Sequence, residues 1–330
     1  MIELVVSAAV TAAVCPVVRR LLVHRGVVDH PNDRSSHVVP TPRGGGLACS
    51  VGVLAGWTVA VASGRVLPLP VLAVILALAV LGLLDDHFRL SALIRLATQV
   101  VVGALLGVAV GGGLGILPGA LLSAVLVSTS VNIVNFMDGI NGITGITMAV
   151  WGSSVALLGY FDEAPTLLVL GSLTVGAALG FLPYNLPRAR LFLGDVGSYL
   201  FGGLVATTLL LGMLGGARLA PLFAPVALYF ADASVTLVRR AIRRASLLKP
   251  HREHTYQRLV HEARLSHVKV SVLTALLSVA VTGSWFVMTP LWASAVTASV
   301  VTAYLLLPTL LVKRLGRRSR RVSVTTPDAM

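Results

Sequence analysis

Two long apolar segments are joined by the polar stretch Asn132-Ile-Val-Asn135-Phe-Met-Asp138-Gly-Ile-Asn141-Gly142. The three-residue spacing of Asn132, Asn135 and Asp138 predicts that two amides and a carboxylate line one face of a helix end. Glycines at 139 and 142 then let the backbone turn close to whatever those groups hold. Because a polar face costs several kcal/mol in hydrocarbon, we expect it to face protein or water. An ordinary polar loop between two membrane helices is the alternative.

The composition around this stretch is that of a chain that crosses a membrane many times. Of the 330 residues, 56% are hydrophobic and 12% are charged. Apolar runs of about 16–22 residues match the ~20 residues needed to cross ~30 Å of hydrocarbon. We therefore expect an all-α polytopic integral membrane protein in which residues 1–330 form a single transmembrane domain. Eleven helices are expected, at 2–22, 45–63, 69–84, 93–110, 117–134, 143–160, 167–184, 196–213, 219–238, 269–289 and 291–312.

The positive charges predict the orientation of these helices. When the connecting loops are assigned alternately to two sides, 24 of the 26 Lys and Arg residues share one side, and only Arg65 and Arg218 lie on the other. The positive-inside rule then places the amino terminus outside and the carboxyl terminus in the cytoplasm. The net charge of +13 follows the topology, which argues against a nucleic-acid partner. The basic cytoplasmic tail, 313–330, is expected to anchor the last helix at membrane lipids.

Carboxylates recur at the predicted cytoplasmic edge. The third helix ends in Asp85 and Asp86, and Asp195 is the only acid between residues 164 and 231. Adjacent carboxylates repel each other, so the pair needs a cation or a nearby arginine. Oxygen ligands of this kind suit Mg²⁺, which commonly binds through one or two carboxylates and substrate phosphates. Acids exposed at a helix terminus are the alternative.

The first predicted cytoplasmic loop offers donors for phosphate oxygens. Arg34, His37 and Arg43 lie in a segment whose prolines and glycines favour a non-helical path. Glycines 44–46 open the next helix, where free backbone N–H groups also favour an anion. A basic loop that meets anionic lipid is the alternative.

The segment that leads into Asp195 contributes two further candidates. Asn185 lies just beyond the seventh predicted helix, and Phe192 precedes Gly194. The glycines on either side of Asp195 allow a ligand to approach closely. Phe192 is placed to stack on an aromatic ring such as a nucleobase, although core packing is the commoner fate of a phenylalanine.

The longest hydrophilic loop, 239–268, contains His251, Arg252 and His254. Histidine and arginine that face a diphosphate are the preferred interpretation. An amphipathic helix at the lipid headgroups is the alternative. The two histidines hint at a metal, but no nearby Cys or third His completes a zinc set.

Asp232 falls inside the ninth predicted helix, where an acid is a site candidate by default. An ion pair with Arg239 or Arg240 is the structural alternative. Taken together, carboxylates with Arg and His donors and no thiols describe a Mg²⁺–diphosphate site. Its place at the lipid boundary suggests one water-soluble substrate and one lipid. The residues alone thus predict metal-dependent phosphoryl chemistry on a membrane lipid.

The order of these motifs resembles that of the polyprenyl-phosphate N-acetylhexosamine-1-phosphate transferases, glycosyltransferase family 4. The resemblance covers roughly residues 29–259, from the first loop to the late histidine loop. It implies transfer of a sugar-1-phosphate from a UDP-sugar to undecaprenyl phosphate with release of UMP, using Mg²⁺ or, as a substitute, Mn²⁺. It also implies a bacterial inner-membrane enzyme with a cytoplasmic active site, acting at the start of a cell-envelope polysaccharide such as the lipopolysaccharide O-antigen. A homodimer is a further expectation.

The resemblance also implies roles for individual residues. Asp195 matches the family's magnesium-binding aspartate, with Asp86 as a second candidate ligand. Asp85 and Asp86 match the paired aspartates, one of which orients or deprotonates the lipid phosphate. Asp138 lies near the metal and nucleotide, and His251 and His254 match the loop that contacts the sugar-phosphate. The expected substrate-binding residues are Asn132, Asn135, Asn141, Asn185, Phe192, Arg34, His37, Arg43 and Arg252.

Two departures from the family pattern affect the expected substrate. Asn141 stands where many relatives have Asp, and the late loop reads His-Arg-Glu-His at 251–254 instead of a run of histidines. This looks more like the O-antigen initiating branch, with an N-acetylhexosamine or a 6-deoxy-N-acetylhexosamine, than like the peptidoglycan translocase. Phospho-MurNAc-pentapeptide transfer is one alternative. An ion-coupled transporter is the other, and it would place its site near the membrane midplane within inverted repeats.

Overall fold

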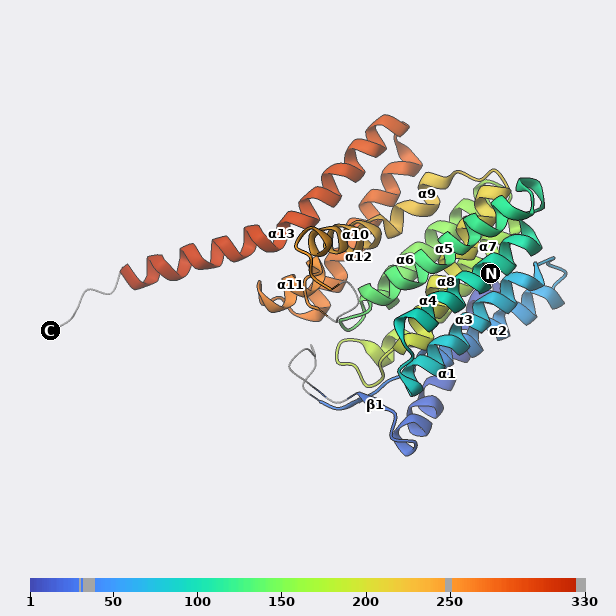
Figure 1. Cartoon of the computed structure of the whole chain (residues 1–330), viewed down its shortest axis with the longest axis horizontal. Coiled ribbons are helices and arrows are strands. Elements are labelled where there is room, and N and C mark those ends of the chain that lie inside the picture. The colour runs from blue at the N-terminus through green and yellow to red at the C-terminus, as the bar shows by residue number, and fades with distance from the viewer. Residues whose placement is uncertain (30, 32–38, 247–250, 325–330) are drawn as a thin grey trace.

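The structure, a computed structural model, describes residues 1–29, 31, 39–246 and 251–324, with side chains described up to residue 314. Apolar helices dominate it (Figure 1). The first eight are α1 (Ile2–His24), α2 (Gly46–Ala62), α3 (Leu69–Phe88), α4 (Ala92–Val110), α5 (Ile116–Met137), α6 (Ile143–Phe161), α7 (Pro165–Asn185) and α8 (Gly194–Leu214).

The remaining elements are shorter or follow the eighth helix. The later helices are α9 (Leu219–Phe223), α10 (Ala227–Ile242), α11 (Thr255–His261), α12 (His267–Val287) and α13 (Pro290–Val324). Two 3₁₀ turns, η1 (Gly112–Leu114) and η2 (Ala224–Val226), and two short strands, β1 (Val28–Asp29) and β2 (Thr41–Pro42), complete the described elements. The strands pair antiparallel, with Val28 opposite Pro42.

The predicted all-α membrane fold is confirmed. Among the described residues, ten helices are long and apolar enough to cross a membrane, counting 219–242 as one, and α2 is a shorter apolar helix of 17 residues. These eleven occupy the places expected from the sequence. The orientation of the helices across the membrane stays a prediction.

Two helices differ most from the expected bounds. The ninth is not continuous, because η2 with Pro225 interrupts it before α10 begins at Ala227. Proline lacks the N–H that a helix interior requires, which explains a break at this point. The last helix runs on to Val324 and projects beyond the body of the molecule (Figure 1).

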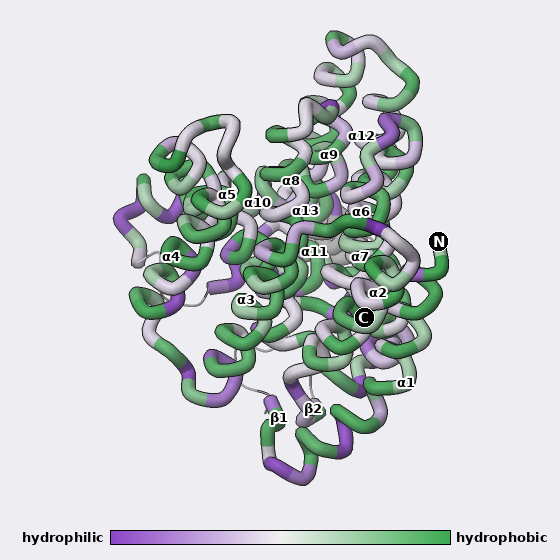
Figure 2. The backbone as a smooth tube through the Cα atoms, turned by 90° about the vertical axis from the view of Figure 1, so that its right-hand side faces the viewer, coloured by the Kyte–Doolittle hydropathy of each residue, from purple (hydrophilic) through white to green (hydrophobic). Residues whose placement is uncertain are grey.

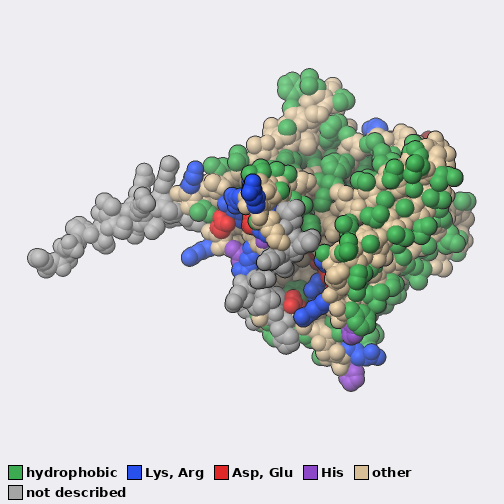
Figure 3. Space-filling model, in the orientation of Figure 1, with side chains coloured by type: hydrophobic (Ala, Val, Ile, Leu, Met, Phe, Trp, Pro, Cys, Tyr) green, Lys and Arg blue, Asp and Glu red, His purple; other side chains and the backbone are tan. Residues whose placement is uncertain are grey.

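Helix α8 forms the centre of the bundle. Of the 18 consecutive residues that form the most apolar part of α8, 89% are buried. In the corresponding part of α13, at the periphery, 11% are buried. Helices α2, α3, α5 and α7 pack against α8, and α1 packs against α2 and α7. Figure 2 shows hydrophobic residues along most of the helices and hydrophilic segments near their ends. In Figure 3 charged side chains gather toward the end of the bundle that carries α11, while hydrophobic side chains cover the right-hand face.

Candidate active site

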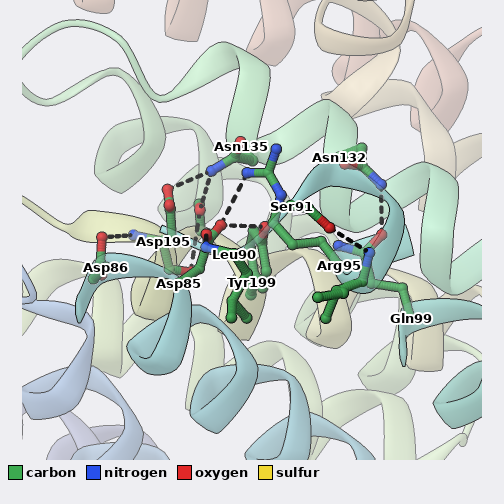
Figure 4. A network of polar contacts seen from close by, with 12 residues as sticks. Asp85, Asp86, Leu90, Ser91, Arg95, Gln99, Asn132, Asn135, Asp195 and Tyr199 are labelled. Carbon is green, nitrogen blue, oxygen red and sulfur yellow. Dashed lines mark hydrogen bonds and ion pairs between the residues drawn. The ribbon is translucent and has the colours of Figure 1, made fainter. Parts of the chain in front are cut away.

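Asp195 lies in the first turn of α8, where segments from three parts of the chain meet (Figure 4). Its Oδ1 accepts hydrogen bonds from Asn135 Nδ2 at 2.7 Å and from Arg43 Nη2 at 2.6 Å. The Asn135 Nδ2 also donates to Ser198 Oγ at 3.0 Å. The Asp195 side chain is 13% exposed, so its charge is largely shielded from water. The structure thus brings Asn135, Arg43 and Asp195 together as predicted.

Asp86 fixes the start of the helix that carries Asp195. Its carboxylate accepts the backbone N–H of Asp195 at 3.0 Å and of Val196 at 3.1 Å, and pairs with Arg43 Nε at 2.8 Å. A carboxylate at free N–H groups is favourable because it satisfies donors that have no partner within the helix. Gly82, one turn earlier on α3, permits this approach, since a Cβ there would collide with the Asp195 carbonyl. Both oxygens of Asp86 are therefore used in positioning.

Asp85 faces a different set of partners from its neighbour. It accepts hydrogen bonds from Leu90 N at 2.9 Å, Arg95 Nη1 at 2.9 Å and Tyr199 Oη at 3.1 Å. The repulsion expected between adjacent carboxylates is relieved because each pairs with its own arginine, Asp85 with Arg95 and Asp86 with Arg43. Asp85 accordingly joins α3 to α4 and α8.

The other asparagines predicted for the site hold the fold around it. Asn132 donates from Nδ2 to Gln99 Oε1 at 2.6 Å and to the Ser128 carbonyl at 2.8 Å, and so ties α5 to α4 (Figure 4). Asn185 accepts from Gly142 N at 2.5 Å and donates to the Leu191 carbonyl at 3.0 Å. The structure does not bring these two side chains to Asp195.

Asn141 makes its recorded contacts through the backbone. Its N–H donates to His267 Nδ1 at 3.3 Å, and its carbonyl accepts from Ser271 Oγ at 2.9 Å. Both partners belong to α12, so the end of the polar stretch is fastened to that helix. The amide side chain of Asn141 is not part of these bonds.

The loop around Arg43 and the loop before Asp195 are bonded through the backbone of Phe192. Its N–H donates to the Pro42 carbonyl at 2.8 Å, and its carbonyl accepts from Gly44 N at 3.1 Å and Gly45 N at 2.8 Å. This pairing holds Arg43 at the start of α8. Burial alone would lower the pKa of Arg43, but the charges of Asp195 and Asp86 raise it, so the guanidinium stays charged. Arg34 and His37 lie outside the described residues.

Asp138 ends α5, one turn after Asn135, and is partly buried. Burial raises the pKa of Asp138 to about 6, while Thr144 and the charge of Arg43 offset part of that rise. The charge of Asp195 acts in the same direction as burial.

A second polar cluster forms around Asp232 of α10, which is completely buried. Its carboxylate accepts the N–H of Thr255 at 2.8 Å and of Tyr256 at 3.3 Å, the first residues of α11, and the hydroxyl of Tyr304 at 3.2 Å. Asp232 thus anchors the start of α11 much as Asp86 anchors α8. The alternative of an ion pair with Arg239 or Arg240 is not what the structure shows for Asp232.

Asp232 and α11 place His254 beside the polar stretch. The His254 side chain is 3% exposed, and its Nδ1 lies 3.6 Å from Asp232 Oδ1. Its ring lies near those of His251 and Phe136, with centroids 4.9 and 6.2 Å away. Tyr256 donates to the Phe136 carbonyl at 2.9 Å and thereby docks α11 on the end of α5.

Glycine is required at position 139 for this docking. A Cβ on Gly139 would collide with the Tyr256 hydroxyl. Glu253 pairs with Arg240. Arg252, which stands between His251 and His254 in the sequence, is half-buried. The predicted late loop is therefore folded against the bundle at residues 251–261, and α11 is too short and too buried to lie freely at the lipid headgroups.

Sequence reasoning missed several residues that shape these clusters: Gln99, Arg95, Tyr199, Tyr256 and Tyr304. Gln99, Arg95 and Tyr304 lie in apolar helices with no motif around them, whereas Tyr199 and Tyr256 directly follow the segments that carry Asp195 and His254. The usable signal was the rule that a buried acid must find donors, which applies to Asp85 and Asp232. That rule predicts that donors exist without identifying them.

We expect Tyr304→Phe to lower kcat about tenfold, the lower end of the range for one hydrogen bond to a charged acceptor. Tyr304 touches Asp232, which in turn holds α11, so its loss should loosen His254 with little change in KM. Steady-state kinetics with Tyr160→Phe, an exposed tyrosine, provide the matched comparison. Equal kcat in both variants would show that α13 does not act on the histidine loop.

A pH effect follows from His251. Burial, then the charges of His254 and Arg240, lower the pKa of His251 to about 4 from 6.5. Since the unfolded chain binds this proton more readily, His251 should reduce stability as pH falls from 6.5 toward 4 and have no such effect above 6.5. Unfolding temperatures in detergent should thus decline less over this window in His251→Gln than in the wild type. An equal decline of the unfolding temperature with pH in both proteins would contradict this effect of His251.

The oxygens around Asp195 fit a hard divalent cation. Asp195 supplies a carboxylate, Asp138 a second nearby, and Asn135 an amide whose recorded bonds use nitrogen only. Within the described part of the chain, no group of three or more His, Cys, Asp or Glu side chains could hold an ion unaided. Carboxylate and amide oxygens are ligands that suit Mg²⁺, which binds through one or two carboxylates and keeps waters and substrate phosphates in its coordination shell.

The chain is similar in sequence to proteins of one family. A family model described as glycosyl transferase family 4 matches residues 68–213, the segment from α3 to α8. The decaprenyl-phosphate N-acetylglucosaminephosphotransferase of Mycobacterium tuberculosis is 34% identical over 78% of this chain and 74% of its own length. A probable undecaprenyl-phosphate N-acetylglucosaminyl 1-phosphate transferase of Bacillus subtilis is 28% identical over 82% and 80%. The phospho-N-acetylmuramoyl-pentapeptide-transferase of Symbiobacterium thermophilum is 33% identical over 60% and 68%.

Proposed function

Because the chain belongs to glycosyl transferase family 4, we propose that it transfers a sugar-1-phosphate from a UDP-sugar to a polyprenyl phosphate such as undecaprenyl phosphate, releasing UMP. The two relatives matched over the larger share of this chain are both named for N-acetylglucosamine, which we take as the first sugar to test. The product would start a cell-envelope polysaccharide in the bacterial inner membrane, with the site on the cytoplasmic side.

One observation carries this proposal: the carboxylates of Asp86 and Asp195 meet a charged arginine, Arg43, beside an apolar pocket. The pocket has a volume of about 270 Å³, and Arg43 and Asp86 lie in its wall. Its other lining residues are Leu22, Val27, Leu83, Leu84, His87 and Phe88. An apolar wall that ends at a guanidinium suits a molecule with a hydrocarbon chain and a phosphate.

In the proposed reaction, an oxygen of the lipid phosphate attacks the β-phosphorus of the UDP-sugar. The bond from that phosphorus to the bridging oxygen breaks, and the oxygen leaves with UMP. Arg43 neutralises charge on the reacting phosphates, while Asn135 and Asp86 hold Asp195 and Arg43 in place. Positioning and electrostatics supply most of the catalysis in such transfers.

Asp195 would hold Mg²⁺, with Asp138 and Asn135 close by, and the ion would spread the negative charge that develops on the phosphates. When no ion is bound, burial raises the pKa of the Asp138 carboxyl above its ordinary value, which would favour a role as proton acceptor for the lipid phosphate. His251 and His254 would contact the sugar-phosphate.

The test uses purified protein with undecaprenyl phosphate and Mg²⁺. Separate reactions contain UDP-N-acetylglucosamine, other UDP-N-acetylhexosamines, UDP-6-deoxy-N-acetylhexosamines and UDP-MurNAc-pentapeptide. We expect UMP and radiolabelled lipid from a HexNAc donor, loss of both with a chelator, and recovery with Mg²⁺ or Mn²⁺. Turnover of the MurNAc-pentapeptide donor alone would favour the translocase activity. Ion flux in vesicles without UMP from any donor would favour a transporter.

A further inference from the structure

We propose that a small basic pocket at the ends of α1 and α7 binds the phosphate of an anionic glycerophospholipid. The pocket has a volume of about 250 Å³ and is lined by Pro16, Arg19, Arg20, Tyr184 and Arg190. Nothing in the proposed reaction uses these residues. Three guanidinium groups around one small volume are suited to a phosphate, which arginine binds through paired N–H donors.

Within the described part of the chain, the charges in this pocket are not balanced by carboxylates. Among the described residues, Arg43, Arg95 and Arg258 each have a carboxylate partner. Within the same part of the chain, no carboxylate pairs with the three arginines of the pocket. An anion would remove the repulsion between these like charges.

Two of the three arginines are already held in place. Arg19 Nε donates to the Arg190 carbonyl at 3.1 Å, and Arg190 Nη2 donates to the Pro183 carbonyl at 2.8 Å. The Arg190 guanidinium lies 5.4 Å from the centroid of the Tyr184 ring. These contacts use only one N–H group of each arginine, so further donors remain for a ligand.

The setting favours a lipid over free phosphate. The pocket lies at the end of a membrane-spanning helix, and Val17 and Leu21 of α1 are 62% and 47% exposed beside it. Acyl chains would cover such apolar side chains while the headgroup phosphate meets the arginines. Basic pockets between transmembrane helices commonly bind anionic headgroups in this way.

The pocket also adjoins the segment that leads to Asp195. The N–H groups of Arg190 and Leu191 both donate to the Tyr184 carbonyl, and Phe192 then holds the loop of Arg43. A bound headgroup would steady this segment. Any effect of the bound lipid on turnover rests on the proposed function. Binding of the lipid to the pocket does not depend on that function.

Binding is measured on the full chain in nanodiscs or detergent, by native mass spectrometry and by thermal stabilisation. The probes are phosphatidylglycerol, phosphatidylcholine and millimolar inorganic phosphate. We expect phosphatidylglycerol to bind more tightly than phosphatidylcholine. Arg20→Gln should weaken phosphatidylglycerol binding about fivefold, the factor typical of one interfacial arginine.

Arg25→Gln is the matched control, because it removes the same charge from an exposed residue of the same region. It should weaken phosphatidylglycerol binding less than Arg20→Gln does. Arg20→Lys should restore only part of the affinity, because lysine keeps the charge but lacks the paired N–H donors of arginine. Equal losses in Arg20→Gln and Arg25→Gln would overturn the site in favour of general attraction. Equal protection by inorganic phosphate would overturn the choice of a lipid. Neither outcome depends on whether UMP is released.

Discussion

Asp195→Asn is expected to lower UMP release at least ~10³-fold, the scale at which a charge-stabilising group acts in phosphoryl transfer. The asparagine keeps the size of the side chain but removes the negative charge. Asn135 and Arg43 would then face an uncharged amide, and a divalent cation would lose its principal protein ligand. The fold should persist because Asp86 still holds the first turn of α8 through backbone N–H groups.

The measurement is UMP release by purified protein, with Mn²⁺ binding followed by electron paramagnetic resonance as an independent readout. Asp162→Asn is a suitable control, because Asp162 also pairs with an arginine, Arg218, outside the site. It should retain near-normal turnover and Mn²⁺ affinity. Near-normal UMP release by Asp195→Asn would remove Asp195 from the chemistry and leave it a structural role.

Apolar run length predicted most of the fold, because the width of the membrane fixes the length of a spanning helix. The expected third helix, 69–84, nevertheless stops short of the observed end at Phe88. Asp85 and Asp86 look like loop residues when hydropathy alone is considered, yet they form the last helical turn. Their hydrogen bonds to α4 and α8 stabilise that turn. Hydropathy averaged over neighbouring residues contains no information on such distant partners.

Only part of the candidate site could be predicted, again because the partners of a side chain lie far away in the sequence. The sequence named Asp195, Asn135 and Arg43 as candidates, and the structure brings these three side chains together. Adjacent helical residues point about 100° apart, and in the structure Asp85 meets Arg95 and Tyr199 whereas Asp86 meets Arg43 and the start of α8. Equally, the spacing that relates Asn132 to Asn135 does not tell which neighbour each amide meets, and Asn132 meets Gln99 instead.

For Asp232, the sequence predicts that hydrogen-bond donors surround the carboxylate but does not identify them. A lone acid within an apolar helix indicates that donors lie nearby. Its donors come from α11, 23 residues later, and from Tyr304, 72 residues later. Only the folded chain identifies them, and it converts a candidate catalytic acid into a residue that positions His254.

His254→Ala is expected to lower kcat about 10²-fold or more, the usual scale for a positioned histidine that contacts a reacting group. His254 is buried between α11 and the end of α5, close to Phe136 and Tyr256, so it is held in one orientation. Removing the ring takes away a donor to the sugar-phosphate while Asp232 still anchors α11 through Thr255.

Two further variants separate chemistry from folding at this position. His254→Gln keeps a polar side chain and should recover part of kcat, whereas His24→Ala, at the far end of α1, should leave kcat and KM unchanged. A fall in kcat with a preserved KM and unfolding temperature would place His254 at the reacting phosphates. An unchanged kcat would mean that residues 251–261 serve only to close this end of the bundle, because a buried histidine that contacts the transferred group cannot be dispensable.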